Sequence, residues 1–322
     1  NKFILDFIFV LLIAYSLTVF AWPHVHGNIF TEPFKLLLIQ LKSSFGIPWI
    51  LFDGNFYETD KLPYFYILKN FFYKTPEYIL LCYIAFVCIV VINKKFFTST
   101  FHFFWYKILL ITFIFLFPTI YFVFLPYRVY DGLRLFLYLI PYFNIIPGLV
   151  IYYFLSNKNR LISKISLLTL SGLFLYFLFI FVLLTPYQYT YLNKFNGNFS
   201  NAHKKFENDY WSISTKELVS KISNNINLFP KGKKIKITFC GAPSSLIKND
   251  LNNIKNLKYE ENNLYNKDFE YVIMTNRVVG EKENNLLENV KTCFDKFEGK
   301  DLISVERNGL MLSTLRKRVA EN

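Results

Sequence analysis

Five long apolar stretches constrain the fold of this chain more than any other feature. A helix needs about 17 to 25 apolar residues to cross a bilayer, and a buried soluble core would not contain five such stretches. The composition agrees, because 53% of the residues are hydrophobic, 18% are charged and the mean hydropathy is +0.28. The sequence therefore predicts a polytopic α-helical membrane protein with helices at Phe3 to Ala21, Pro76 to Asn93, Ile108 to Leu125, Leu135 to Leu155 and Ile165 to Leu184.

The first stretch has the length of a secretory signal peptide, but its flanks do not fit one. A signal peptide carries a basic segment before its apolar core and a small-residue cleavage site after it. Here only Lys2 precedes the stretch, and Trp22-Pro23 follows it. We therefore interpret it as a membrane helix.

Basic residues in two short connections predict the orientation of the helices. The connections 93–107 and 156–164 each carry three Lys or Arg residues and no acidic residue. By the positive-inside rule both are cytoplasmic. The fifth helix then runs outward, so everything after Thr185 is expected on the extracytoplasmic side.

Proline interrupts two of the predicted helices. Pro118 lies in the third, and Pro141, Asn144 and Pro147 lie in the fourth. One interpretation is a plain kink, which is common in membrane helices. The other is that these helices surround a cavity, because freed backbone groups inside a membrane need protein or water as partners.

The segment 22–77 is expected to form a long loop at the membrane interface within a transmembrane domain of residues 1–189. Its portion 29–45 predicts an amphipathic helix on the membrane surface, and the aromatic residues from Trp49 to Tyr66 suit the headgroup layer. The apolar face of that helix contains Phe30, Phe34, Leu37, Leu38 and Leu41.

His24 and His26 form an H-x-H pair in the same loop. No carboxylate or third histidine stands nearby, as a metal site would require. We interpret the pair as interfacial histidines and expect no cofactor or metal within this chain.

The short loop before the fourth helix carries Arg128, Asp131 and Arg134. Arginine suits a phosphate at a membrane surface, because its planar fork donates two parallel hydrogen bonds. The alternative is that Asp131 pairs with Arg134 one turn later and both side chains snorkel to the interface.

Residues 190–322 read as a small soluble α/β domain, because 22 of the 36 basic and 16 of the 23 acidic residues fall there. Ser214 and Glu217 have the spacing of a capping box at the start of a helix. Hydrophobic periodicity and an Asn-Gly turn give the other elements. We expect helices at 212–224, 249–257 and 284–294, strands at 234–240 and 269–275, and a hairpin of 302–307 with 310–316 around Asn308-Gly309.

Cys240 and Cys293 lie in a compartment that permits disulfides, but sequence alone does not decide whether they pair. The tail contains no Gly-rich phosphate loop, H-E-x-x-H, serine triad pattern or C-x-x-C pair, so no soluble-enzyme chemistry is predicted there. The net charge of +13 is spread over both parts, which excludes a nucleic-acid groove.

Three segments carry a resemblance to a known family. They are a Leu-Pro-aromatic stretch before the Thr75-Pro76 helix start, the run Tyr130-Asp131-Gly132-Leu133-Arg134 before a Pro-broken helix, and Pro186-Tyr187-Gln188-Tyr189 followed by Phe206-Glu207-Asn208-Asp209-Tyr210-Trp211. The chain resembles the C-terminal part of bacterial GT-C membrane glycosyltransferases, the RgtA/B/C/D-like proteins, which are related to dolichyl-phosphate-mannose protein mannosyltransferases.

The resemblance implies an enzyme of the bacterial inner membrane. Such an enzyme moves a sugar from a polyprenyl-phosphate carrier to a lipid, polysaccharide or protein acceptor on the extracytoplasmic face. An acidic base in the first outer loop and cationic residues, often with a divalent metal, would perform the chemistry. That loop is expected upstream of Asn1, since the chain has no initiator Met; the fragment alone should be inactive. The candidate substrate-binding residues are Arg128, Asp131, Arg134, Tyr187, Gln188, Asp209 and Trp211.

The alternative function is a non-enzymatic membrane protein, either an envelope-polysaccharide transporter or a sensor whose tail binds a ligand. A transporter predicts paired repeats and ionisable groups at mid-bilayer. The charges of this chain instead cluster at the helix ends.

Overall fold

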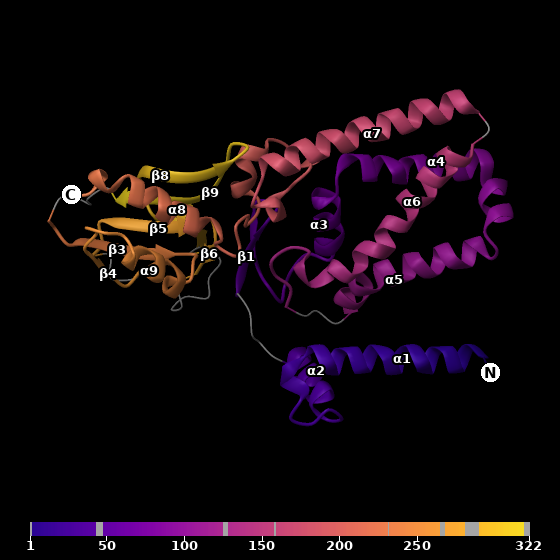
Figure 1. Ribbon diagram of the computed structural model, residues 1–322, viewed down its shortest axis with the longest axis horizontal. Helices are drawn as coiled ribbons and strands as arrows, with labels where there is room; N and C mark the ends of the chain where they lie inside the picture. Colours follow the sequence, from indigo (N-terminus) through magenta and orange to yellow (C-terminus); the bar gives the residue numbers. More distant parts are fainter. Residues whose placement is uncertain are drawn as a thin grey trace. The chain divides into compact units, whose positions relative to one another are not determined.

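The computed structural model describes residues 2–42, 48–124, 128–157, 159–230, 232–264, 268–280 and 290–318 (Figure 1). The chain divides into two compact units, residues 1–46 and 47–322.

The first unit contains the apolar helix α1 (Lys2–Ala21), the 3-10 turn η1 (Pro23–Val25) and α2 (Glu32–Lys42). Before α2, the carboxamide oxygen of Asn28 accepts hydrogen bonds from the backbone N–H groups of Phe30 and Thr31. The helix α2 falls within the predicted amphipathic segment, and Phe34 and Leu38 on it are exposed. The predicted residues 43–45 lie outside the described residues.

Four further long helices belong to the second unit: α4 (Glu77–Thr100), α5 (Phe104–Phe124), α6 (Ile140–Ser156), which the 3-10 segment η2 (Arg134–Leu139) precedes, and α7 (Arg160–Leu183). Together with α1, the described residues thus include five helices that are long and apolar enough to cross a membrane. The prediction of five long apolar helices is confirmed. Several predicted boundaries differ from the structure. The helix α4 leaves helical geometry only at Asn93 and then stays helical to Thr100. The helices α5 and α7 begin at Phe104 and Arg160, four and five residues before their predicted starts.

The outward faces of these helices are apolar. Leu109 on α5 is 70% exposed and Leu168 on α7 is 72% exposed, whereas α4 and α6 meet through buried Cys82, Phe86 and Val150. Water would oppose so much exposed hydrocarbon, and a bilayer would not. The five long apolar helices are therefore compatible with a membrane protein.

The segment 48–76, which precedes α4, forms structure that the sequence did not predict. A hairpin of β1 (Trp49–Phe52) and β2 (Asn55–Glu58) turns at Asp53-Gly54, where both residues have positive φ, and α3 (Tyr66–Lys74) follows. Phe52, Leu62 and Tyr66 are buried in a protein core rather than placed in a headgroup layer. The interfacial assignment of these three side chains was therefore wrong.

The C-terminal region contains a five-stranded sheet in the order β4-β3-β5-β9-β8. The strands β4 and β5 are parallel to β3, while β9 is antiparallel to both β5 and β8. The bounds are β3 (Ile235–Cys240), β4 (Tyr259–Glu261), β5 (Tyr271–Thr275), β8 (Gly299–Arg307) and β9 (Leu310–Arg318). Figure 1 shows this sheet with α8 (Ser214–Asn224) and α9 (Ser244–Asn252) beside it.

The central strand β5 is buried on both faces. Tyr271 and Ile273 join the core that includes α8, and the alternate residues Val272 and Met274 join a second core with the disulfide. This alternation is the ordinary two-residue period of a strand. Both predicted strands and the Asn308-Gly309 hairpin are confirmed.

Two helix predictions in this region differ from the structure. The helix predicted at 249–257 is α9, which begins at Ser244 and ends at Asn252. The helix predicted at 284–294 lies mostly outside the described residues, and only the short α10 (Cys293–Lys296) overlaps its end. The remaining short elements are β6 (Val278–Val279), β7 (Lys291–Thr292), η3 (Gln188–Thr190), η4 (Lys194–Asn196), η5 (Phe199–Lys204) and η6 (Ile226–Leu228).

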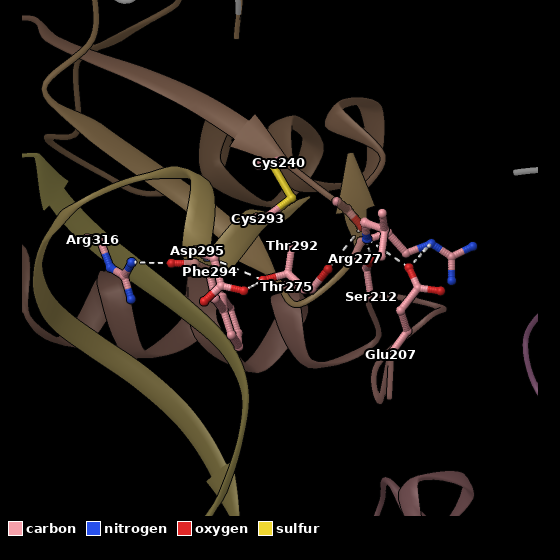
Figure 2. Close-up of a disulfide and its surroundings, with 12 residues drawn as sticks. Glu207, Ser212, Cys240, Thr275, Arg277, Thr292, Cys293, Phe294, Asp295 and Arg316 are labelled. Atoms are coloured by element: carbon pink, nitrogen blue, oxygen red, sulfur yellow. Dashed lines mark hydrogen bonds and ion pairs between the residues drawn. A yellow bond between two sulfur atoms is a disulfide. The ribbon is translucent and has the colours of Figure 1, made fainter. Parts of the chain in front are cut away.

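Cys240 at the end of β3 and Cys293 at the start of α10 form a disulfide, with Cα atoms 5.8 Å apart (Figure 2). Beside it, Gly241 has φ +74°, and a Cβ there would lie 2.5 Å from the Cβ of Arg277 and 2.8 Å from the Oγ1 of Thr275. Only glycine fits this crossing. The sequence left the pairing of the two cysteines open, and the structure shows it formed.

Candidate functional site

A tight turn before η2 places a buried carboxylate at the centre of a charged cluster. Asp131 and Gly132 both have positive φ, and the Asp131 side chain is only 4% exposed. Its Oδ2 accepts a hydrogen bond from Nη1 of Arg134 at 3.1 Å, and its Oδ1 accepts one from Nη1 of Arg277 at 2.8 Å. The predicted pairing of Asp131 with Arg134 is present, and a second arginine joins it.

Arg277 reaches this turn from the segment between β5 and β6, and its side chain is 10% exposed. Its Nε lies 3.7 Å from Oε1 of Glu207, and that oxygen accepts a hydrogen bond from the backbone N–H of Val278. Figure 2 shows Glu207 beside Arg277, close to the disulfide. The carbonyl of Arg277 accepts a hydrogen bond from the N–H of Cys293, so the disulfide segment fixes the Arg277 backbone.

Arg134 is the most exposed charged side chain of the cluster, at 37%. Its guanidinium lies 4.2 Å from the ring centroid of Trp211, which is half-exposed. Its hydrogen bond to Asp131 uses Nη1, and within the described part of the chain neither Nε nor Nη2 has a hydrogen-bond partner. A guanidinium stacked on an indole is held in orientation while its edge stays available to a ligand.

Lys74, at the end of α3, lies beside the same turn. A Cβ added to Gly132 would be 2.9 Å from its Nζ, which also lies 5.9 Å from the ring centroid of Tyr210. The hydroxyl of Tyr66 accepts a hydrogen bond from the N–H of Gly132 and so ties α3 to the turn.

Burial shifts two pKa values in this cluster. It raises the pKa of Glu207 from 4.5 to about 7, although Arg277 and the N–H of Val278 oppose the shift. It lowers the pKa of Lys74 from 10.5 to about 8, against the attraction of Asp131. Both groups therefore titrate close to neutral pH.

Asp209, a predicted substrate contact, is used by the fold instead. Its carboxylate accepts hydrogen bonds from the N–H groups of Ile213 and Ser214 at 3.0 and 2.9 Å, and from the hydroxyls of Ser214 and Tyr189. It therefore caps the start of α8. The capping box predicted from Ser214 and Glu217 is wrong, because Ser214 is already helical and makes no cap with its own side chain.

Tyr187 and Gln188 belong to a different place from the Asp131 cluster. The Tyr187 hydroxyl donates to Oε2 of Glu217 at 2.9 Å, and the guanidinium of Arg307 lies 5.0 Å from the Tyr187 ring centroid. Gln188 donates from Nε2 to Oγ1 of Thr185 at 2.9 Å. Within the described part of the chain, neither side chain forms a hydrogen bond with Asp131, Arg134 or Trp211, which the structure brings together.

Arg307 also forms a bidentate pair with Glu217 and donates from Nε to the carbonyl of Thr185 at 2.9 Å. Burial acts to raise the pKa of Glu217, but hydrogen bonds from Arg307 and Tyr187 outweigh it and hold that pKa below its ordinary value.

Arg128 is half-buried on the segment leading into the Asp131 turn, and the two ion pairs of Asp131 go to Arg134 and Arg277 instead. Sequence reasoning missed Lys74, Glu207 and Arg277 as members of the cluster. Glu207 stands in one of the segments that carry the family resemblance, so its signal was present. Arg277 follows a predicted strand, and nothing in its local sequence indicates a partner 146 residues away.

No group of three or more His, Cys, Asp or Glu side chains suited to a metal occurs within the described ranges. Comparison with protein-family models, curated proteins and solved structures finds no match to this chain. Any functional conclusion therefore rests on the residues themselves.

Proposed function

We propose that this chain forms part of a membrane glycosyltransferase that takes a sugar from a polyprenyl-phosphate carrier and transfers it to a lipid, polysaccharide or protein acceptor at the extracytoplasmic face. The proposal rests on the family resemblance of three sequence segments. In it, Arg134 stabilises the lipid phosphate that leaves the sugar, and no residue of this chain is assigned as the catalytic base.

One observation supports the proposal more than any other. Two of the segments that carry the resemblance, Tyr130 to Arg134 and Phe206 to Trp211, are far apart in sequence and meet in space. Arg134 from the first stacks on Trp211 from the second, and Asp131 from the first shares Arg277 with Glu207 from the second. A resemblance by chance would not require its separate segments to converge.

The convergence also gives Arg134 a chemical role. Asp131 holds one edge of the guanidinium and Trp211 holds its face, where the chain enters the apolar helix η2–α6. A positioned cation at the end of a membrane helix can bind a lipid-borne phosphate and stabilise its charge as the sugar leaves. Tyr187, Gln188 and Asp209 have structural contacts, and we do not assign them to the substrate.

The test uses the full gene product in membranes and measures transfer of radiolabelled sugar from its polyprenyl-phosphate donor. Arg134→Gln should lower the transfer rate about 100-fold, the size seen when one charge-stabilising donor is removed. Membrane abundance should stay unchanged. Arg160→Gln is the matched control, because Arg160 is an exposed arginine at the start of another membrane helix, α7.

Equal transfer rates in Arg134→Gln and the unchanged protein would leave Arg134 with a packing role only. A rate restored by Arg134→Lys would show that a point charge suffices and that the planar fork is dispensable.

A further inference from the structure

A small cavity lies between α3, the Asp131 turn and the segment 206–208. It has a volume of about 30 Å³, room for one or two oxygen-sized atoms. Its polar lining residues include Tyr66, Asn70, Lys74, Asp131, Glu207 and Asn208. The cavity is thus polar on several sides and enclosed by elements that come from distant parts of the chain.

Two hydrogen-bond donors at this cavity have no partner among the described residues. The Nδ2 of Asn208 is buried without a hydrogen bond, in a residue that is only 4% exposed. The ammonium of Lys74 makes no hydrogen bond or ion pair there either, and Asp131 acts on it only through longer-range attraction. A buried donor without a partner is costly, and the half-buried Lys74 ammonium beside it is also unpaired within the described ranges. Together they indicate that a ligand supplies the acceptor.

The charge around the cavity points to the sign of that ligand. The charged residues that line it are one cation, Lys74, and two carboxylates, Asp131 and Glu207. Arg134 and Arg277 do not line the cavity but pair with these carboxylates. Both oxygens of Asp131 are already paired with arginines, and Glu207 is paired with Arg277 and Val278. The Lys74 ammonium is thus the charge at the cavity that has no partner among the described residues, and a bound anion would compensate it.

We propose that this cavity binds the anionic oxygens of a phosphate group, free or carried on a lipid, through the Lys74 ammonium and the Asn208 amide. The small volume admits one or two oxygens, and the rest of the ligand lies at the mouth of the cavity. Binding needs no sugar transfer, so this inference stands or falls separately from the proposed enzyme.

The experiment measures binding of inorganic phosphate to the purified full chain in detergent by isothermal titration calorimetry, at pH 6.5 in constant 150 mM NaCl. Lys74→Met should weaken binding at least tenfold, which corresponds to about 1.4 kcal/mol. Lys69→Met is the matched control, because Lys69 lies on the same helix and pairs with Asp53 away from the cavity. Its affinity should equal that of the unchanged protein.

Asn208→Asp provides a second variant that keeps the side-chain shape and the backbone hydrogen bond to Asn276. The added carboxylate should repel the anion and weaken binding more than tenfold. This variant decides the question if Lys74→Met does not fold. Absence of any phosphate binding by the unchanged chain, or equal affinity in Lys74→Met, Asn208→Asp and the unchanged protein, would overturn the proposal.

Nanodiscs distinguish the two sources of phosphate. In discs of phosphatidylcholine containing phosphatidic acid, a lipid-borne ligand should compete, so inorganic phosphate binds more weakly than in pure phosphatidylcholine discs. Equal affinity in both discs would assign the site to free phosphate. Either result supports the site, provided that Lys74→Met weakens binding at least tenfold.

Discussion

Two arginines of the C-terminal region contact carboxylates from other segments, and their surroundings differ. Arg277 meets Asp131 where both side chains are nearly buried, at 10% and 4% exposed. Arg307 meets Glu217 where both remain accessible, at 22% and 27%. Each also joins the sheet region to residues next to a membrane helix, because Asp131 precedes η2 and Thr185 follows α7.

The cost of removing one partner of an ion pair depends on whether the remaining charge is buried or can be solvated by water. At the Arg307 pair, water can solvate a carboxylate that loses its partner, so the pair adds little to stability. At the Arg277 pair, a lost partner leaves a charge inside protein, where the desolvation cost is large. The buried pair is therefore the one that fixes the site geometry.

The largest expected effect follows from removing the buried cation. Arg277→Met should lower the free energy of unfolding by about 3 to 5 kcal/mol, because the Asp131 carboxylate stays buried and keeps only its ion pair with Arg134. Unfolding of the detergent-solubilised protein by guanidinium measures this. The double variant Arg277→Met with Asp131→Asn should recover part of the loss, since it removes the stranded charge. A double variant as unstable as the sum of the singles would contradict the coupling.

The pH dependence of stability should be intermediate in size. Burial raises the pKa of Glu207 from 4.5 to about 7, so the folded state holds more protons than the unfolded state between these values. The free energy of unfolding should therefore fall as pH rises from 4.5 to 7, by at most about 3.4 kcal/mol. Lys74, which faces Asp131, Tyr66 and Tyr210, has its pKa lowered from 10.5 to about 8. Stability should rise again from pH 8 to 10.5, because there the folded state holds fewer protons.

A minimum of stability between pH 7 and 8 is the checkable outcome, measured as thermal unfolding across pH 4 to 11. Glu207→Gln should flatten the acid limb and Lys74→Met the alkaline limb. Glu298→Gln, a change at an exposed glutamate, should leave both limbs in place. If stability still falls from pH 4.5 to 7 in Glu207→Gln and still rises from pH 8 to 10.5 in Lys74→Met, other groups cause the pH dependence.

The smallest effect is expected at the accessible pair. Arg307→Met should lower the free energy of unfolding by only about 0.2 to 1 kcal/mol, and 1 M salt should erase most of the difference by screening. The same salt should leave the Arg277→Met effect largely unchanged. Equal losses in the two variants would remove the distinction between the pairs.

The sequence predicted those features that local chemistry decides. Apolar length indicated the membrane helices, and the Asn308-Gly309 dipeptide indicated the hairpin. The hairpin of β1 and β2 was missed although Asp53-Gly54 signals such a turn, because the surrounding aromatics were assigned to the membrane surface. The buried protein contacts around Phe52 come from residues such as Phe206, which no local pattern connects to it.

The candidate site was predicted in part for the same reason. Asp131 and Arg134 are three residues apart, so a local contact between them could be predicted, although a tight turn and not a helix brings them together. Arg134 on Trp211 and Asp131 with Arg277 join residues that only the folded chain brings together. Asp209 was assigned to substrate through the family resemblance, whereas its carboxylate accepts hydrogen bonds from Ile213, Ser214 and Tyr189 at the start of α8.

Gly132 is the position of the charged cluster where no larger residue fits without moving its neighbours. The missing side chain at this position lets the loop pass within touching distance of the lysine at the end of α3. A methyl group there would have to push the amine aside, and the turn, the amine and the hydroxyl of Tyr66 would shift together. The hydrogen atom of Gly132, in place of a side chain, therefore lets the Lys74 ammonium lie next to the turn that leads into η2 and α6.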